Sequence, residues 1–266
     1  MQRTVSAHLD AQVAAATEIV LSIAVARGPK IVDEDLTIAV GDTPIDPEEI
    51  VEPDGTRLHV CRDLPEGQLN VDYSATVDGQ VDEPWSADLA PHVYSRPSRY
   101  CESDKLLHIA GALFANLEGF ELVDAVRNWV NEKVLYLSGW SRVTDGSVDT
   151  FLQRQGVCRD FAHLVVTFLR SRNMPARLSS VYAPGLSPMD FHAVAEAYVD
   201  GEWWVIDATG LAPREAMLRI AIGRDAADTA FLTTTRGRLK MGRMSVTAVI
   251  DPELPTEDPS AHVQLR

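Results

Sequence analysis

A cysteine stands where the sequence predicts the start of a helix. Gly156 ends the preceding element, and the apolar stripe of the next helix follows Cys158, beginning with Phe161 and Leu164. In the first turn of a helix, the aligned peptide dipoles favour a thiolate over a thiol, and the thiolate is the nucleophilic form. Cys158 is therefore a candidate nucleophile, although a cysteine considered alone is more often a buried structural residue.

A histidine and an aspartate flank a turn sequence that is typical of two-residue hairpins. Alternating runs lie on either side of Asp200-Gly201. In that register residues 199 and 202 face each other, which makes His192 and Asp207 diagonal neighbours on one face. Diagonal neighbours lie roughly 7–8 Å apart at the backbone, within reach of these side chains. We expect Asp207 to hydrogen-bond to His192, fix its tautomer and favour an imidazolium beside a thiolate.

The three residues together predict one kind of chemistry. Viewed singly, His192 is more often a core histidine and Asp207 a turn or strand-end residue. In the order Cys, His, Asp they can form a triad: Cys158 attacks a carboxamide or peptide carbonyl, His192 protonates the leaving amine, and Asp207 orients His192. The product of that attack is a thioester, which water or an amine resolves.

The elements before residue 95 are predicted to be strands. Segments 18–26, 36–40, 57–62 and 68–77 are rich in β-branched residues and are separated by Gly, Pro and Asp turn sequences. Short strands at this spacing predict a β-sandwich. The alanine-rich stretch 11–17 is compatible with a helix, and its type is left open.

After a proline-rich stretch at 84–98, which favours extended chain, the apolar period becomes helical. Helices are predicted from Ser103 as a cap to residue 117, around 122–130, at 148–155 and from Cys158 to residue 173, before an antiparallel sheet from residue 177. The fold class is therefore α+β, with the helix that begins at Cys158 packed on the sheet. We expect a β-sandwich domain of residues 1–95 and a catalytic core of residues 96–266.

The text around these residues resembles a known family. GVCRDFAHLVVTFLRSRNMPAR, with Cys158, and DFHAVAEAYVDGEWWVIDAT, with His192 and Asp207, resemble the bacterial transglutaminase-like superfamily, whose members are often described as cysteine proteases. The resemblance extends to PSRYCESD and PREAMLRIAIGRDAADTAFLTT, over about residues 95–250. It implies a papain-like core in which Cys158 is the nucleophile and His192 and Asp207 complete the triad. Many relatives carry Trp where this chain has Val194, a difference that bears on the shape of the pocket.

A thioester-forming reaction also needs donors for the developing oxyanion. The backbone N–H of Cys158 is one candidate. The second donor is sought among Tyr136, Trp140 and Gln155, each of which alone is more often a packing residue.

Other polar residues near the triad have structural interpretations. Asp160 is expected to cap the first turn of the helix, and His163 to pack or to bond to backbone. Arg224-Asp225, in the family-like GRDAAD, is expected to form an ion pair, either buried near the site or on the surface.

Charge and motifs exclude several partners. Basic residues number 24 and acidic residues 39, so the net charge is −15. This balance repels nucleic acid and anionic membranes, and neither is expected as a partner. No HExxH, Cys-His knuckle, GxGxxG or Walker sequence occurs, so neither a cofactor nor a metal is expected. The expected partner is a peptide or protein amide substrate.

Three widely spaced cysteines do not form a disulfide framework, and they fit a reducing compartment. Cys61 is expected in a strand core and Cys101 packed at the domain junction. The first residues lack the features of a signal peptide, and the apolar stretch 19–26 is too short to span a membrane. We therefore expect a cytoplasmic protein.

Hydrolysis, by a protease or amidase, is the preferred function. The alternatives are a cross-linking transglutaminase and a non-catalytic binding module of the same fold, although a degenerate module is expected to have lost a triad residue. An arylamine acetyltransferase uses the same residue order, but the leading sandwich and the GRDAAD segment argue against it. The sequence leaves the substrate, the acceptor and the oligomeric state open.

Overall fold

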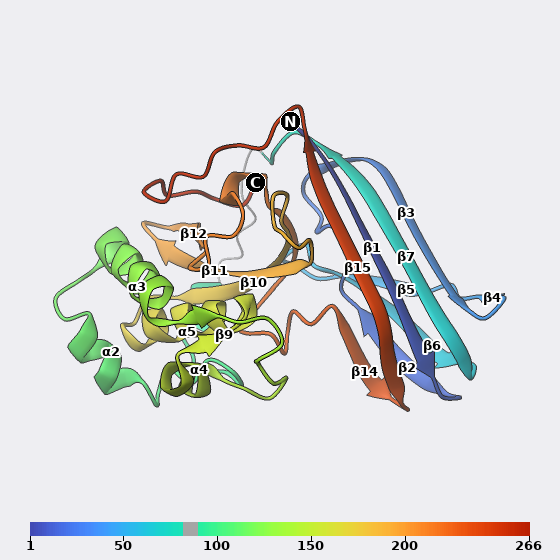
Figure 1. The fold of residues 1–266 in the computed structure, drawn as a ribbon, viewed down its shortest axis with the longest axis horizontal. Coiled ribbons are helices and arrows are strands. Elements are labelled where there is room, and N and C mark those ends of the chain that lie inside the picture. The colour runs from blue at the N-terminus through green and yellow to red at the C-terminus, as the bar shows by residue number, and fades with distance from the viewer. Residues whose placement is uncertain (82–89) are drawn as a thin grey trace.

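A computed structural model describes residues 1–81 and 90–266. Figure 1 shows a β-sandwich on the right and a helical core with its own sheet on the left. One sheet of the sandwich has the strand order β15-β1-β7-β3-β4 and the other β14-β2-β6-β5. The bounds of these strands are β1 Gln2–Val13, β2 Thr17–Leu21, β3 Lys30–Val40, β4 Thr43–Pro44, β5 Glu48–Val51, β6 Arg57–Leu64, β7 Gly67–Asp78, β14 Leu232–Arg236 and β15 Leu239–Asp251.

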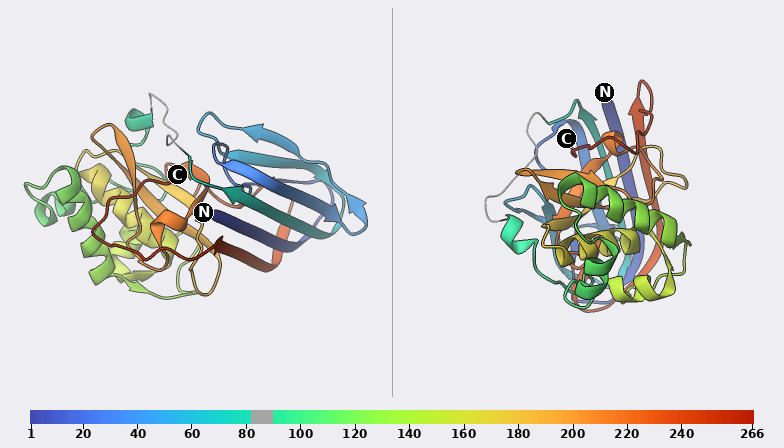
Figure 2. Two further views of the ribbon diagram at one scale, coloured as in Figure 1. Left: turned by 90° about the horizontal axis from the view of Figure 1, so that it is seen from above. Right: turned by 90° about the vertical axis from the view of Figure 1, so that its left-hand side faces the viewer.

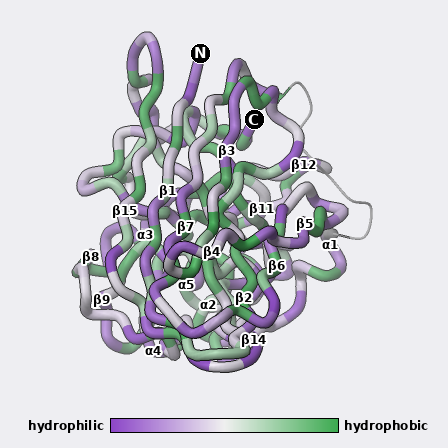
Figure 3. The backbone as a smooth tube through the Cα atoms, turned by 90° about the vertical axis from the view of Figure 1, so that its right-hand side faces the viewer, coloured by the Kyte–Doolittle hydropathy of each residue, from purple (hydrophilic) through white to green (hydrophobic). Residues whose placement is uncertain are grey.

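The strands of the sandwich alternate apolar and polar residues, so that one face of each sheet is buried against the other sheet. Along β1 and β7 every second side chain is buried, and the residues between them point to solvent or lie at the edge. Figure 3 shows this as changes of colour along the strands. Val5, Leu9, Val71 and Ile19 meet in the core between the sheets. The predicted β-sandwich is therefore present, and the stretch 11–17 is the end of β1 and a turn rather than a helix.

The sandwich is not made by residues 1–95 alone. β15 pairs along β1, from Gln2 opposite Asp251 to Val13 opposite Leu239, and β14 pairs with β2. The predicted division at residues 95 and 96 therefore assigns these two late strands to the wrong unit. They join the sandwich because their apolar residues, among them Val246 and Ala248, complete its core.

The core places helices against a second antiparallel sheet of order β12-β11-β10-β13. Figure 2 shows the helices on the side away from the sandwich. Phe161, Leu164, Val165 and Phe168 of α5 pack with Ala195 of the sheet. The bounds are α1 Ala90–Val93, α2 Leu107–Leu113, α3 Gly119–Lys133, β8 Leu135–Tyr136, α4 Ser147–Gln153, β9 Gln155–Gly156, α5 Cys158–Ser171, β10 Ala176–Tyr182, β11 Phe191–Val199, β12 Glu202–Ile206 and β13 Leu218–Gly223, with a 3₁₀ turn at Arg214–Ala216.

The predicted helices are present with shifted ends. The first begins at Leu107 after Leu106, which makes no side-chain cap, so Ser103 does not cap it. Part of the expected proline-rich extended stretch, residues 82–89, lies outside the described residues, and Pro91 lies within the short helix α1. No helix in the described parts of the chain has the length and apolar character needed to cross a membrane.

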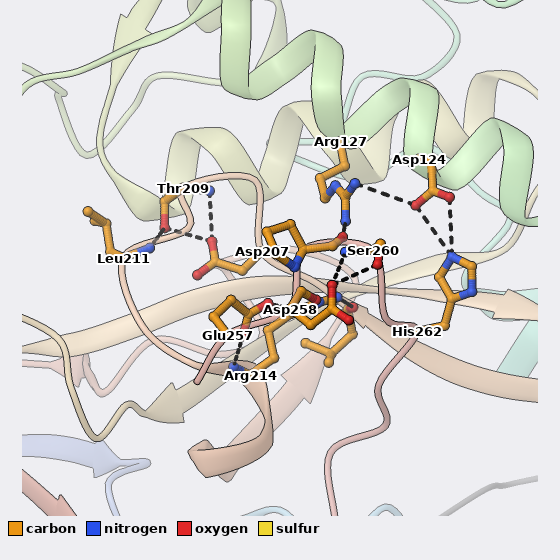
Figure 4. A network of polar contacts seen from close by, with 12 residues as sticks. Asp124, Arg127, Asp207, Thr209, Leu211, Arg214, Glu257, Asp258, Ser260 and His262 are labelled. Atoms are coloured by element: carbon orange, nitrogen blue, oxygen red, sulfur yellow. Dashed lines mark hydrogen bonds and ion pairs between the residues drawn. The ribbon is translucent and has the colours of Figure 1, made fainter. Parts of the chain in front are cut away.

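The segment after β15 returns to the core and binds α3. The Arg127 guanidinium donates to the carbonyl of Pro259, and His262 stacks on Phe120 with ring centroids 3.9 Å apart. His262 also contacts Asp124 at 3.3 Å. Figure 4 shows Asp124 between Arg127 and His262, in a view that also includes Asp207. The segment thereby ties the strand that closes the sandwich to the helical layer.

Candidate active site

The turn before α5 places Cys158 at the first position of the helix. Val157 is extended, and the Asp160 carboxylate accepts its N–H at 2.8 Å. A Cβ on Gly156 would lie 2.6 Å from the Cβ of Asp160, so this close approach requires glycine. The prediction that Asp160 caps the first turn is confirmed. The cap fixes the backbone at the start of the helix, where Cys158 lies.

Tyr136 is the oxyanion-donor candidate that the structure brings to Cys158. Parallel pairing of β8 with β9 sets Tyr136 opposite Gly156. Burial and the neighbouring Cys158 sulfur raise the pKa of Tyr136 to about 12, so its phenol stays protonated and can donate. Tyr136 is 38% exposed and Trp140 is 56% exposed.

The hairpin has the predicted register, and its histidine and aspartate meet. Val199 faces Glu202, and the ladder continues to Ala195 opposite Ile206. Beyond its end, His192 Nε2 lies 2.9 Å from Asp207 Oδ2. Both side chains are almost completely buried, at 0% and 2% exposure. The parity argument therefore predicted the contact correctly.

The environment favours a charged pair. Burial lowers the pKa of His192, but the charge and hydrogen bond of Asp207, together with the nearby Cys158, raise it to about 10. Burial raises the pKa of Asp207, yet His192 and Thr209 hold it below its usual range. His192 Nδ1 is buried and has no hydrogen-bond partner among the described residues. This nitrogen is available to the neighbouring thiol.

Comparisons with known proteins place this geometry in a family. The model of the transglutaminase-like superfamily matches residues 112–208, which contain all three residues. The crystal structure of a "putative cysteine protease" from Cytophaga hutchinsonii is 32% identical, with a TM-score of 0.87 over 98% of this chain and 95% of that one. An uncharacterized protein of Mycobacterium leprae is 29% identical over 192 residues, 62% of this chain and 67% of its own length.

The chain belongs to the transglutaminase-like superfamily. In this superfamily member the Asp207 carboxylate is held on both oxygens. Oδ2 contacts His192, and Oδ1 accepts the Thr209 N–H at 2.8 Å and the Thr209 hydroxyl at 2.6 Å. The Asn131 side chain donates to the carbonyl of Ala208 at 2.8 Å. Sequence reasoning missed the role of Thr209, although Asp-x-Thr after a strand is a signal for this kind of turn.

The other cysteines of this superfamily member are packing residues, as predicted. Burial raises the pKa of Cys61 to about 11 and that of Cys101 to about 12. Cys101 lies in the core beneath α5. Cys158 is partly exposed, and it is therefore the thiol that solvent-borne reagents can reach.

The GRDAAD segment forms a different ion pair from the one predicted. Arg224 pairs with Asp228 at 2.9 Å and lies on the surface. Asp225 is buried and accepts the N–H groups of Tyr100 and Ala227. His163 accepts the N–H of Ala226 at 3.1 Å, which confirms its predicted bond to backbone. The bond between Ala226 and His163 holds this segment against α5.

We expect the His192–Asp207 pair to stabilise the fold in a defined pH range. A histidine whose pKa is raised from 6.5 to about 10 stabilises the folded state fully below pH 6.5, and this stability is lost as the pH rises towards 10. Urea unfolding of wild type and Asp207→Asn should therefore differ most near pH 6, and the difference should shrink towards pH 10. A difference that grows with pH contradicts the assignment of a charged His192.

Proposed function

We propose that this protein catalyses acyl transfer at amide or peptide carbonyls through a thioester on Cys158. The observation that supports this most is the buried His192–Asp207 pair, 2.9 Å apart, beside a cysteine that opens a helix. Nucleophilic catalysis by cysteine uses this arrangement, in which a buried carboxylate orients an imidazole next to a thiol and favours its protonated form.

The proposed reaction begins with attack of the Cys158 thiolate on the carbonyl carbon. The negative oxygen that forms is stabilised by the Cys158 N–H and the Tyr136 phenol. His192, as imidazolium, gives its proton to the leaving nitrogen, the C–N bond breaks, and a thioester remains. Asp207 stays ionised and keeps the imidazole oriented.

The second half of the reaction releases the acyl group. Neutral His192 takes a proton from water, the resulting hydroxide attacks the thioester carbon, and the C–S bond breaks to give a carboxylic acid and the Cys158 thiolate. We propose water as the acceptor, and thus a protease or amidase that acts on a peptide or protein. A cross-linking transglutaminase would use an amine in place of water at this step. A non-catalytic binding module would form no thioester.

The proposed chemistry uses groups of the chain itself and includes no cofactor. We place it in the cytoplasm, because all three cysteines are free and the thiol has to stay reduced.

A direct test is acylation by p-nitrophenyl acetate. The purified chain should release p-nitrophenolate in a burst, and mass spectrometry of the quenched protein should find the acetyl group on Cys158, because the two buried thiols react slowly. Addition of monodansylcadaverine then distinguishes the acceptors: hydrolysis leaves the amine unmodified, and a transglutaminase consumes it. Acetyl groups found on Cys61 or Cys101, or absent from Cys158, contradict the proposal.

A further inference from the structure

The sandwich and the core together enclose a cavity beside Cys158. Its volume is about 490 Å³, and Cys158 and His192 are part of its wall. The lining also includes Ser22 after β2, Leu232 of β14 and Met244 of β15. The sandwich therefore contributes directly to the surroundings of the thiol.

The cavity is lined mainly by apolar and aromatic side chains. Phe191 and Phe231 stack with ring centroids 5.3 Å apart, and Leu178 and Ile220 lie beside them. A lining of this kind favours an apolar group, and above all an aromatic ring, over a charged one. A volume of this size accommodates a large side chain.

Two hydroxyl groups in this wall have no hydrogen-bond partner among the described residues. They are Ser22 Oγ and Ser180 Oγ, and both oxygens are buried. Ser22 is 2% exposed, and it comes from the sandwich, whereas Ser180 lies on β10 of the core. Buried hydroxyls are normally paired, so an occupant with an uncharged polar end would satisfy them.

Two charged side chains of the wall already make hydrogen bonds. The Arg159 guanidinium donates to Ser141 Oγ and to the Arg142 carbonyl, both at 2.7 Å, and to Asp160. Asp190 accepts the Phe191 N–H at 2.7 Å and lies at the exposed end of β11. Arg159 Nε is buried and has no hydrogen-bond partner among the described residues, and Arg159, Asp190 and His192 all belong to the lining.

We infer that this cavity binds the substrate side chain on the carbonyl side of the scissile amide, and that tyrosine is the preferred residue. The inference rests on the proposed function of Cys158. We assign the cavity to the acyl part, which stays bonded to Cys158 in the thioester while the amine departs, and the reagents used below carry their side chain on that part. The ring of tyrosine matches the apolar wall, and its hydroxyl would give Ser22 Oγ or Ser180 Oγ a hydrogen-bond partner.

The test uses N-acetylated chloromethyl ketones of Gly, Tyr, Phe, Leu, Lys and Glu. In each case the Cys158 thiolate displaces chloride and forms a C–S bond, and peptide mass spectrometry gives the rate of modification. We expect the tyrosine reagent to react about tenfold faster than the phenylalanine reagent, because a site built to bind a hydroxyl discriminates against its absence. Leu should follow, and Lys and Glu should not exceed Gly.

Two variants locate the preference in this cavity. The double change Ser22→Ala/Ser180→Ala should bring the ratio of the Tyr and Phe rates close to one. Ala193→Leu places a larger side chain in the cavity lining. It should lower the rate of modification by the Tyr reagent relative to the rate with the Gly reagent. Ser6→Ala is the matched control, because its hydroxyl bonds to Thr247 on the outer face of the sandwich.

The outcomes separate the inference from the proposed function. If iodoacetamide and the reagents modify a residue other than Cys158 first, the nucleophile is wrongly assigned. If Cys158 reacts at equal rates with all side chains, or fastest with Lys or Glu, the tyrosine pocket is wrong and the nucleophile stands. A Tyr preference that survives the double serine change overturns the role of the hydroxyls.

Discussion

Replacement of Cys158 by alanine is expected to reduce p-nitrophenolate release to the rate of buffer alone. No other group at the N-terminal end of α5 can form the thioester, since Cys61 and Cys101 are buried elsewhere. On an amide, where the uncatalysed reaction is slow, removal of a nucleophile of this type costs about 10⁶-fold in kcat. The measurement is the initial rate with and without the variant protein.

The variant should remain folded, because it loses one small side chain that is not buried. Circular dichroism and urea unfolding check this. Cys61→Ala is the matched control, since it removes a thiol from the core of the sandwich and should keep the wild-type rate. A Cys158→Ala protein with wild-type turnover would place catalysis elsewhere and favour a binding module.

Changes to the charged pair should come next in size. His192→Ala is expected to abolish turnover nearly as completely as Cys158→Ala, because it removes both the ion-pair partner of the thiolate and the proton donor. Asp207→Asn keeps the ring but disturbs its tautomer, and a loss of up to about 10⁴ is expected. The losses should not add in the double variant, because the residues act as one unit.

Two controls accompany these variants. Asp200→Asn makes the same chemical change at the turn of the same hairpin, where the backbone has φ 52° and Asn is equally suitable. His108→Ala removes an exposed histidine from α2. Both should keep the wild-type rate. Equal losses in Asp200→Asn and Asp207→Asn would point to a general effect on the hairpin rather than to a triad.

The part of the site that could be predicted depends on local signals. The Asp200-Gly201 turn fixes the hairpin register, and the register alone brings His192 to Asp207. Gly156 and the apolar stripe after it likewise fix the start of the helix at Cys158. Each of these signals acts over a few residues, so it is visible in one sequence.

The parts that could not be predicted depend on residues far apart in the chain. Nothing in the pattern of β15 shows that its partner is β1, because any amphipathic edge strand of that length could pair there. For the same reason Ser22 and Met244 could not be assigned to the wall around Cys158. The position of Tyr136 opposite Gly156 also required the pairing of β8 with β9.

Pairing of Gln2 with Asp251 has a consequence for the order in which the protein matures. During synthesis β1 leaves the ribosome long before β15 has been made. Until then, the backbone N–H and C=O groups on the β15 side of β1 are unpaired. The helical core, whose strands and helices are close in sequence, can form earlier. Leu232 and Met244, which belong to the cavity lining, are synthesised later, with β14 and β15. The nascent chain can therefore present Cys158 before the lining of the cavity is complete, because that lining needs β14 and β15.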